Sequence, residues 1–344
     1  MSWNLTGHEW AEKMLKQQIA SGDVRHAYLF TGPPGVGRRT LALQFAKALN
    51  CTQPPAPGEY CGICRLCTQL DKMQQADLTV VQAEQEGGGL KVEALRELLH
   101  NLSLSPYEAR FRVALLLRFQ EATPAAQNAL LKTLEEAPEK VILLLTADNA
   151  ENLLPTIVSR CEVLRLRPLP VDVVSSHLQK RFSISPEKAG LLAQVANGRL
   201  GYAVRLQEEP VLLDQRQTCL TDWWELLHSN RRERFGYIEK FLKVKSSTKE
   251  DRDKLKETLR AQMVTWLSLW RDVLLVQSGS DSPLNNPDEI EHIRLVSNRM
   301  DPIQARRLIT SQEKTLARLS GANLQLTTDV LLLDWPILSS GSDR

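Results

Sequence analysis

The sequence lacks any run of 18 or more apolar residues, the length at which a segment indicates a membrane-spanning helix. Its first twenty residues carry charges throughout and contain no apolar core of a secretory signal. We therefore expect a cytoplasmic protein with no membrane contact. In a reducing cytoplasm, the six cysteines favour metal binding over disulfides.

An excess of charge of one sign is also missing, because 43 Lys and Arg residues stand against 41 Asp and Glu residues, for a net charge of +2. This balance argues neither for nor against nucleic acid, since DNA-binding surfaces are usually local basic patches. The mixed charges are typical of a solvated surface. The 344 residues contain no internal repeat and no long low-complexity tract, and this length suggests two or three domains.

Short apolar segments alternate with segments of helical spacing in the first half of the chain, which predicts an α/β fold with a parallel sheet covered on both faces. The expected strands are 26–32, 78–85, 110–119, 140–147 and 163–170. After Pro170 the strand signals stop. The predicted domains are an α/β domain over 1–168 with a cysteine-rich insertion at 51–67, a small helical domain over 169–208, and a larger helical domain over 209–344 with polar breaks near 246–250 and 278–287.

The stretch "LFTGPPGVGRRT" is similar to a phosphate-binding loop, whose pattern is G-x-x-x-x-G-K-[ST] between a strand and a helix. Gly32 and Gly37 fit this pattern, and Gly35 lies between them. In such a loop the backbone N–H groups cradle phosphates, the Lys reaches the β and γ phosphates, and the hydroxyl binds Mg²⁺. The alternative is that the glycines make only a tight strand-to-helix turn.

Two parts that ATP hydrolysis requires are absent. Arg38 stands in place of the Lys, and Arg39 stands in place of the Ser or Thr. Thr40 carries a hydroxyl one residue late, which is about 100° around a helix. The positions after the strand core 113–117, where an acidic pair would hold Mg²⁺, are not acidic. We therefore expect no ATP hydrolysis by this chain, while weak nucleotide binding through the loop stays open.

Four cysteines form a cluster with two overlapping C-x-x-C steps: Cys51, Cys61, Cys64 and Cys67. Four thiolates suit tetrahedral Zn²⁺, and because no His or acid opens the site, we expect a structural metal. An iron–sulfur cluster and free thiols are the alternatives. Cys161 and Cys219 are isolated, and each is expected to be a buried structural thiol.

Several segments together resemble one family: "HAYLFTGPPGVGRRTLA", "CGICRLC", "AAQNALLKTLEEAP" and "LLTADNAENLLPTIVSRC". The chain resembles the subunits of the bacterial DNA polymerase III clamp loader, which belong to the AAA+ superfamily. The similarity covers roughly residues 26–206, with a weaker match near the C-terminus. The resemblance implies an AAA+ α/β domain with a P-loop, a three-helix lid domain and an all-α collar domain that oligomerises.

The resemblance also implies roles for individual residues. The arginine of "SRC" is Arg160, which corresponds to an arginine finger that acts in trans on the ATP site of a neighbouring subunit. Thr146 lies near the position of the family's polar sensor. Gly201 occupies the slot of a second sensor arginine, so a third part is missing. A chain that offers Arg160 but has no working site of its own fits a stator rather than a motor.

The implied partners are the tau/gamma and delta subunits, the sliding clamp and, through the complex, primed DNA. The first alternative is an active tau/gamma-type ATPase that uses Arg38 with Thr40. The second is a zinc-dependent nucleic-acid-binding module that uses Lys47, Arg65 and Lys72 near the cysteines, although ordinary solvation explains these residues as well. The apolar stripe of 251–277 suits an intramolecular core, a partner surface or both.

Overall fold

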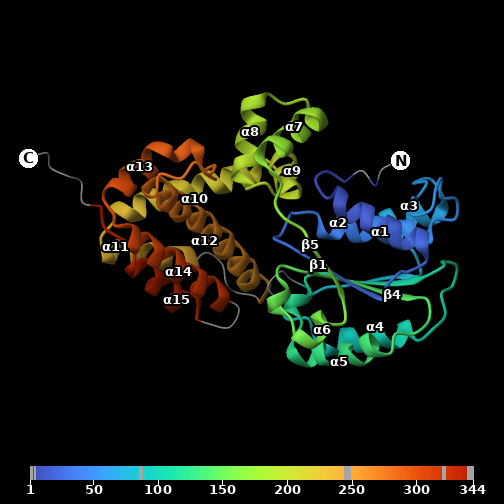
Figure 1. Cartoon of the computed structure of the whole chain (residues 1–344). Helices are drawn as coiled ribbons and strands as arrows, with labels where there is room; N and C mark the ends of the chain where they lie inside the picture. The colour runs from blue at the N-terminus through green and yellow to red at the C-terminus, as the bar shows by residue number, and fades with distance from the viewer. Residues whose placement is uncertain (1–2, 4, 85–87, 244–248, 320–322, 339–344) are drawn as a thin grey trace, which may run out of the picture. The chain divides into compact units, whose positions relative to one another are not determined.

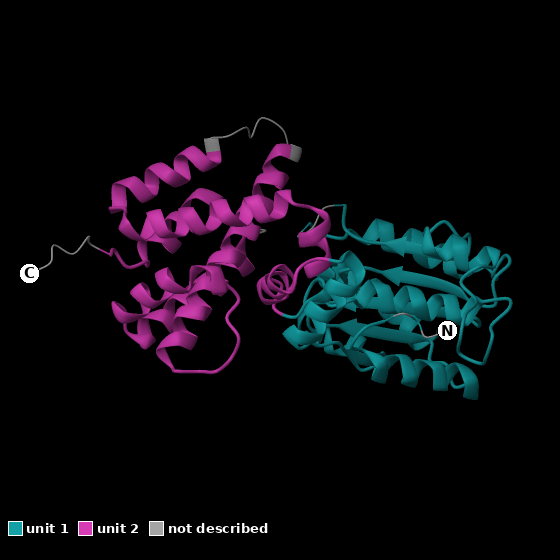
Figure 2. Ribbon diagram, turned by 90° about the horizontal axis from the view of Figure 1, so that it is seen from above, with its two compact units in different colours: residues 1–183, 198–202 teal, residues 184–197, 203–344 magenta. Residues whose placement is uncertain are grey.

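The structure is a computed structural model that describes residues 3, 5–84, 88–243, 249–319 and 323–338. The chain divides into two compact units, which Figure 2 shows in different colours. Unit 1 comprises residues 1–183 and 198–202, and unit 2 comprises residues 184–197 and 203–344. The division into three domains that the sequence suggested stays a prediction.

Unit 1 is built on a five-stranded sheet in which every pair of neighbours is parallel and the order is β2-β3-β4-β1-β5. The strands are β1 (Ala27–Thr31), β2 (Leu78–Val81), β3 (Arg112–Leu116), β4 (Val141–Ala147) and β5 (Glu162–Arg165). The predicted α/β class and all five strands are confirmed. Strands β2, β3 and β5 are shorter than expected, and residue 85 of the expected second strand lies outside the described residues. Strand β5 ends at Arg165, because prolines at 168 and 170 cannot donate to a strand ladder.

Helices cover both faces of this sheet, as Figure 1 shows. One face carries α1 (Glu9–Ser21), α2 (Arg38–Asn50) and α3 (Arg65–Asp71). The other carries α4 (Val92–Leu102), α5 (Pro124–Glu135) and α6 (Pro155–Val158). Each face has its own apolar core, around Phe30 and Phe45 on the first and around Leu130 and Ile157 on the second. The sheet therefore holds the loops after β1, β3 and β4 close together at one edge.

The remaining elements of unit 1 are short or lie at its end. They are the 3₁₀ turns η1 (Phe119–Glu121) and η2 (Ala150–Asn152), and α7 (Val171–Phe182). Helix α9 (Leu200–Glu208) begins in unit 1 and continues into unit 2. Helix α5 begins at Pro124, since Thr123 caps it by accepting a hydrogen bond from the Ala126 N–H, and a proline directly follows the cap.

Unit 2 is helical. Its elements are α8 (Pro186–Val195), α10 (Val211–His228), α11 (Arg231–Lys243), α12 (Lys249–Gln277), η3 (Pro287–Glu289), α13 (Ile290–Asn298), α14 (Pro302–Arg318) and α15 (Leu324–Leu333). The break predicted at 246–250 falls mostly on residues 244–248, outside the described residues, and the break predicted at 278–287 follows the end of α12.

The core of unit 2 is built around tryptophan side chains. Trp270 makes edge-on contacts with Trp223 and Trp335, each with ring centroids 5.3 Å apart. Trp266 and Trp270 on α12 are fully buried, while Val264 on the same helix is 43% exposed. The apolar stripe of 251–277 is therefore mainly intramolecular core.

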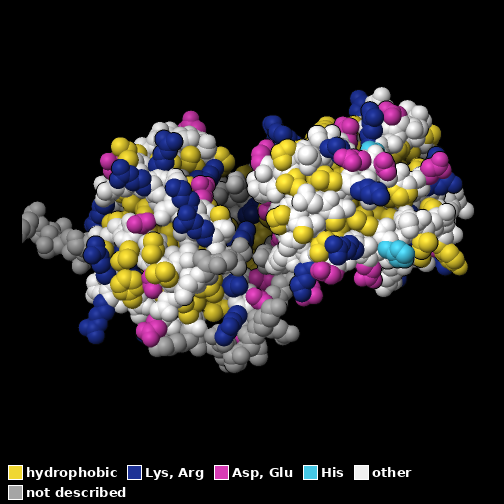
Figure 3. Space-filling model, turned by 90° about the horizontal axis from the view of Figure 1, so that it is seen from below, with side chains coloured by type: hydrophobic (Ala, Val, Ile, Leu, Met, Phe, Trp, Pro, Cys, Tyr) yellow, Lys and Arg dark blue, Asp and Glu magenta, His cyan; other side chains and the backbone are white. Residues whose placement is uncertain are grey.

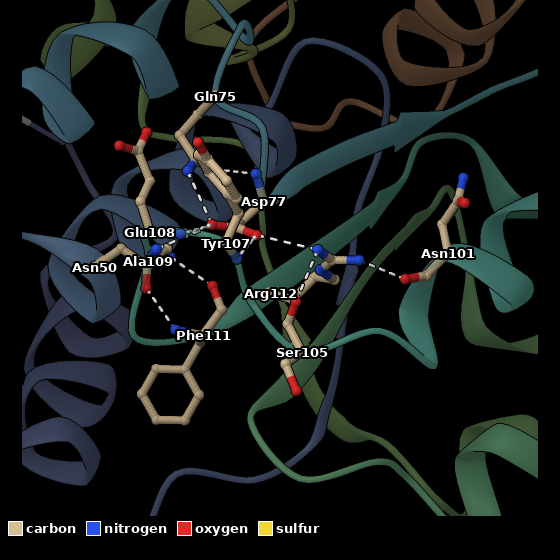
Figure 4. Close-up of polar contacts among 10 residues, drawn as sticks. All are labelled: Asn50, Gln75, Asp77, Asn101, Ser105, Tyr107, Glu108, Ala109, Phe111 and Arg112. Carbon is tan, nitrogen blue, oxygen red and sulfur yellow. Dashed lines mark hydrogen bonds and ion pairs between the residues drawn. The ribbon is translucent and has the colours of Figure 1, made fainter.

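A buried carboxylate fixes the loop that leads into β3 (Figure 4). Asp77 is 1% exposed and accepts hydrogen bonds from the backbone N–H groups of Tyr107, Glu108 and Ala109 at 2.6 to 2.9 Å. Arg112 pairs with the same carboxylate at 3.3 Å. Burial raises the pKa of Asp77, but the three N–H groups outweigh burial and lower it to about 2. The carboxylate is therefore charged and holds the loop at neutral pH.

The surface carries both signs of charge. On the face shown in Figure 3, basic and acidic side chains are interspersed over both units, with apolar side chains between them. No helix of the described residues is long and apolar enough to cross a membrane.

Candidate functional site

The phosphate-type loop joins β1 to α2, at the sheet edge where nucleotide loops of parallel sheets lie. Gly37 caps α2 with a φ of +107°, and a Cβ on Gly32 would lie 2.3 Å from the Leu166 carbonyl oxygen. The N–H of Gly32 donates to the Asp148 carbonyl oxygen at 3.1 Å. Both glycines are thus required by backbone geometry, so their presence alone does not indicate a bound phosphate.

Arg38 does not point freely from the loop. Its side chain is 9% exposed, and its Nη1 lies 2.8 Å from Oδ1 of Asp148, directly after β4. Arg39 is exposed, and its Nη2 lies 2.9 Å from the Met73 sulfur. Thr40 is exposed as well. The positive charge at the lysine slot therefore already has an acidic partner within the chain.

The tip of the loop is in contact with the first turn of α9. The Gly201 N–H donates to the Gly35 carbonyl oxygen at 2.8 Å. A Cβ on Gly201 would lie 2.9 Å from that oxygen, and a Cβ on Gly35 would lie 2.9 Å from the Cβ of Tyr202. A side chain at 201, including the arginine that the family resemblance implies for motors, does not fit this arrangement.

The region after β3, where the ligands of a Mg²⁺ ion would lie, holds an internal ion pair. Arg118 Nε lies 3.1 Å from both carboxylate oxygens of Glu121, the nearest acid along the chain. The Arg118 N–H donates to the Thr146 hydroxyl oxygen at 2.9 Å, and Thr146 is 3% exposed. The polar side chain at the end of β4 therefore links two strand ends of the sheet.

Arg160 follows α6, and 35% of its side chain is exposed. It lies on the segment between α6 and β5, whereas Arg38 lies on α2, so the two arginines belong to different parts of unit 1. The adjacent Cys161 is half-buried, and burial raises the pKa of its thiol to about 12. Cys219 is likewise half-buried, so both isolated thiols are less enclosed than the sequence suggested.

The four clustered cysteines converge, although the first and the second are ten positions apart in the sequence. Their sulfur atoms all lie within 4.8 Å of one another: Cys51, Cys61, Cys64 and Cys67. A tetrahedral Zn²⁺ with Zn–S bonds of about 2.3 Å needs sulfurs roughly 3.8 Å apart, so the thiols fit such an ion.

Backbone N–H groups favour a thiolate at Cys64, whereas burial raises the pKa of Cys51 and of Cys67. The Cys61 N–H donates to the Cys51 sulfur at 3.2 Å, and the Cys64 N–H donates to the Cys61 sulfur at 3.3 Å. Burial raises the pKa of Cys64, but N–H groups of Cys67 and Thr52 outweigh it and lower this pKa to about 6. A cationic metal would favour the deprotonated forms of the thiols.

The basic residues near this cluster do not form one free patch. Lys47 is 4% exposed, because its Nζ pairs with Asp71 at 2.7 Å and lies 4.3 Å from the centre of the Tyr60 ring. Arg65 is exposed and 3.8 Å from Glu108. Lys47 is therefore excluded from the nucleic-acid surface that the sequence suggested.

Three charged or close contacts were missed from the sequence: Arg38 with Asp148, Gly35 with Gly201, and Arg160 with a carboxylate on α5. The first two pairs are more than one hundred residues apart. No local pattern pointed to them, because a sequence window contains only one partner of each.

Residues 7–170 match the family described as DNA polymerase III, delta subunit. The chain is 33% identical over 213 residues to the DNA polymerase III subunit tau of Escherichia coli K12, covering 60% of this chain but only about a third (32%) of that protein. It is 29% identical over 286 residues to DNA polymerase III subunit delta' of Bacillus subtilis, covering 82% of each. A solved gamma subunit-related protein of Thermotoga maritima is 18% identical, with a TM-score of 0.44, and covers 94% of this chain and 97% of that one.

Proposed function

Because this chain is a relative of the delta-prime and tau/gamma subunits of the DNA polymerase III clamp loader, we propose that it is the non-catalytic, delta-prime type of subunit. In this role it is a fixed member of an AAA+ ring that helps to load the sliding clamp onto primed DNA. It has no ATPase activity of its own, and it supplies Arg160 to the ATP site of a neighbouring tau/gamma subunit.

The observation that carries this proposal is that groups of the phosphate-type loop are bonded to other residues of the same chain. The cation at the lysine slot is paired with Asp148, and the carbonyl at the loop tip is bonded to Gly201. The nearest acid after β3 is paired with Arg118. The arginine at the lysine slot and the nearest acid after β3 therefore each have an internal partner, which supports the absence of hydrolysis.

Arg160 supports the second part of the proposal. Its guanidinium is accessible on unit 1, at the end of a short helix fixed by the buried Ile157. An arginine placed in trans stabilises the charge that develops on a transferring phosphoryl group, and such fingers contribute about 10³–10⁵ in rate in GTPases. The chain would thus contribute to catalysis without carrying it out.

The cysteine cluster holds a structural Zn²⁺ in this proposal. The four thiols would saturate a tetrahedral ion and leave no position for a substrate. The metal would fix the insertion between α2 and α3, where the segment 52–59 is largely exposed and contributes little apolar core. Metal analysis would find iron if the cysteines hold an iron–sulfur cluster, and no metal if they are free thiols.

The partners proposed are the tau/gamma and delta subunits, and unit 2 offers a surface for assembly. Leu326, Val330 and Leu333 follow one another at helical spacing on α15 and are 64%, 52% and 41% exposed. An apolar stripe on a terminal helix suits a contact between subunits. Contact with primed DNA and with the clamp would then be made by the assembled ring.

One observation bears on whether the chain binds a nucleotide, which the alternative of a tau/gamma-type ATPase requires. A cavity of about 430 Å³ lies next to the loop, lined in part by His8, Trp10, Arg165 and Arg167. His8 contacts the loop directly, since its Nε2 lies 2.9 Å from the Val36 carbonyl oxygen. An aromatic ring and two arginines are groups that could hold a nucleotide there.

The first test is a calorimetric titration of the purified chain with Mg-ATP, with hydrolysis followed in the same samples. We expect no turnover, and turnover would identify a motor and refute the proposal. The second test compares the reconstituted complex with Arg160→Ala and with Arg25→Ala, an exposed arginine of unit 1. We expect Arg160→Ala to abolish ATP hydrolysis at one site of the complex, while the complex still assembles. Equal turnover in both variants would refute the role of Arg160.

A further inference from the structure

The guanidinium of Arg160 is held by two acceptors on different helices. Its Nη2 donates to Oε1 of Glu135, the last residue of α5, at 2.7 Å. Its Nη1 donates to the Thr156 carbonyl oxygen on α6 at 2.9 Å. The tip of the Arg160 side chain is therefore held in place, in addition to its backbone at the end of the four-residue helix α6.

These two contacts leave most of the guanidinium free to bind an anion. Arginine carries five N–H donors in a planar fork, and the two contacts use one N–H on each Nη. The other three N–H groups make no hydrogen bond among the described residues. A phosphate oxygen could therefore be bound while Glu135 stays in place, so release of the ion pair is not required.

The helices that supply the two acceptors are fixed to each other. At the start of α5, Gln127 accepts a hydrogen bond from the Leu154 N–H at 3.0 Å, and Leu154 caps α6. Leu134 and Ile157 are buried in the same core. Glu135 thus reaches Arg160 from a helix whose position relative to α6 is set at a second point.

From this geometry we infer that Glu135 is a positioning residue for Arg160, an inference that rests on the proposed function of Arg160. Glu135 restricts the guanidinium to the orientation in which its free N–H groups meet the neighbour's phosphate. The pair is screened by water, because 35% of the Arg160 side chain and 52% of the Glu135 side chain are exposed. Exposed pairs of this kind change equilibria by about two- to five-fold.

The test measures steady-state ATP hydrolysis by the reconstituted complex carrying Glu135→Ala, Glu135→Gln, Arg160→Ala or Glu136→Ala. Glu136 is the matched control, since it is the adjacent exposed acid and its carboxylate makes no hydrogen bond or ion pair among the described residues. We expect Glu135→Ala to lower kcat about two- to five-fold at an unchanged KM. Glu135→Gln keeps an oxygen acceptor and should recover part of the loss. Glu136→Ala should match the wild type.

A second measurement uses the chain alone and does not depend on assembly. Phenylglyoxal modifies accessible arginines, and mass spectrometry gives the rate at Arg160. We expect modification of Arg160 to be about two- to five-fold faster in Glu135→Ala than in the wild type or Glu136→Ala. Equal melting temperatures would exclude a general loss of structure.

The outcomes separate the two ideas. If Arg160→Ala lowers turnover while Glu135→Ala matches the wild type, the inference fails and the proposed function stands. A rise in turnover with Glu135→Ala would also overturn the inference, because it would mean that Glu135 withholds Arg160 instead of orienting it. If Arg160→Ala has no effect, the proposed function fails, and the inference fails with it.

Discussion

Replacing Asp77 with asparagine should lower the free energy of unfolding by about 2 kcal/mol at pH 7. The carboxylate accepts three backbone N–H groups and faces Arg112, and an asparagine would turn an NH₂ group toward these donors. A pKa lowered from 3.8 to about 2 corresponds to about 2 kcal/mol, since one pKa unit is about 1.4 kcal/mol. The unpaired donors add to this cost.

The pH dependence distinguishes this cause from a change in packing. The pKa of Asp77 is lower in the folded protein than in the unfolded chain, so the stabilisation is complete above about pH 5. It is lost as the pH falls through about 2. The difference between wild type and Asp77→Asn should therefore shrink to roughly half by pH 3.

The assay is urea unfolding at pH 7 and pH 3, with hydrogen exchange of the segment 105–112 measured in parallel. Asp23→Asn is the control, since Asp23 is exposed and makes no hydrogen bond or ion pair among the described residues. We expect a change below about 0.5 kcal/mol for this control. Equal stability of wild type and Asp77→Asn at pH 7, or a difference that does not shrink at pH 3, would refute the reasoning.

Two further predictions concern the cluster and the loop. Plasma mass spectrometry of the purified chain should find a single zinc ion. The Cys64→Ser variant should lose this ion, and the control Cys219→Ser should keep it. Iron, or no metal, in the wild-type chain would contradict the assignment of zinc. Gly201→Ala should lower the melting temperature through about 1–3 kcal/mol of overpacking, because the new Cβ would lie 2.9 Å from the Gly35 carbonyl oxygen. Gly190→Ala is the control: an added Cβ meets open space in α8, so this substitution should raise the melting temperature slightly. A lower melting temperature for Gly190→Ala together with an unchanged one for Gly201→Ala would contradict this reasoning.

The secondary structure of unit 1 followed from local signals. Runs such as "VILLLTA" are buried along their whole length in β4, and the proline of "PAAQNALL" is the first residue of α5. These signals are local because burial and helix capping are decided within a few residues. The cysteine spacing was informative in the same way, since three of the four thiols lie within seven residues.

Local patterns in the sequence predicted the α/β class, the five strands, a glycine-rich turn after the first of them and the residues of the cysteine cluster. The partners of the charged and close-packed residues became known from the fold alone. It paired Arg38 with Asp148, placed Gly201 against Gly35, and tied Arg160 to Glu135. The physical reason is that parallel strands are joined by long crossovers, so the loops that meet at one sheet edge come from distant parts of the chain.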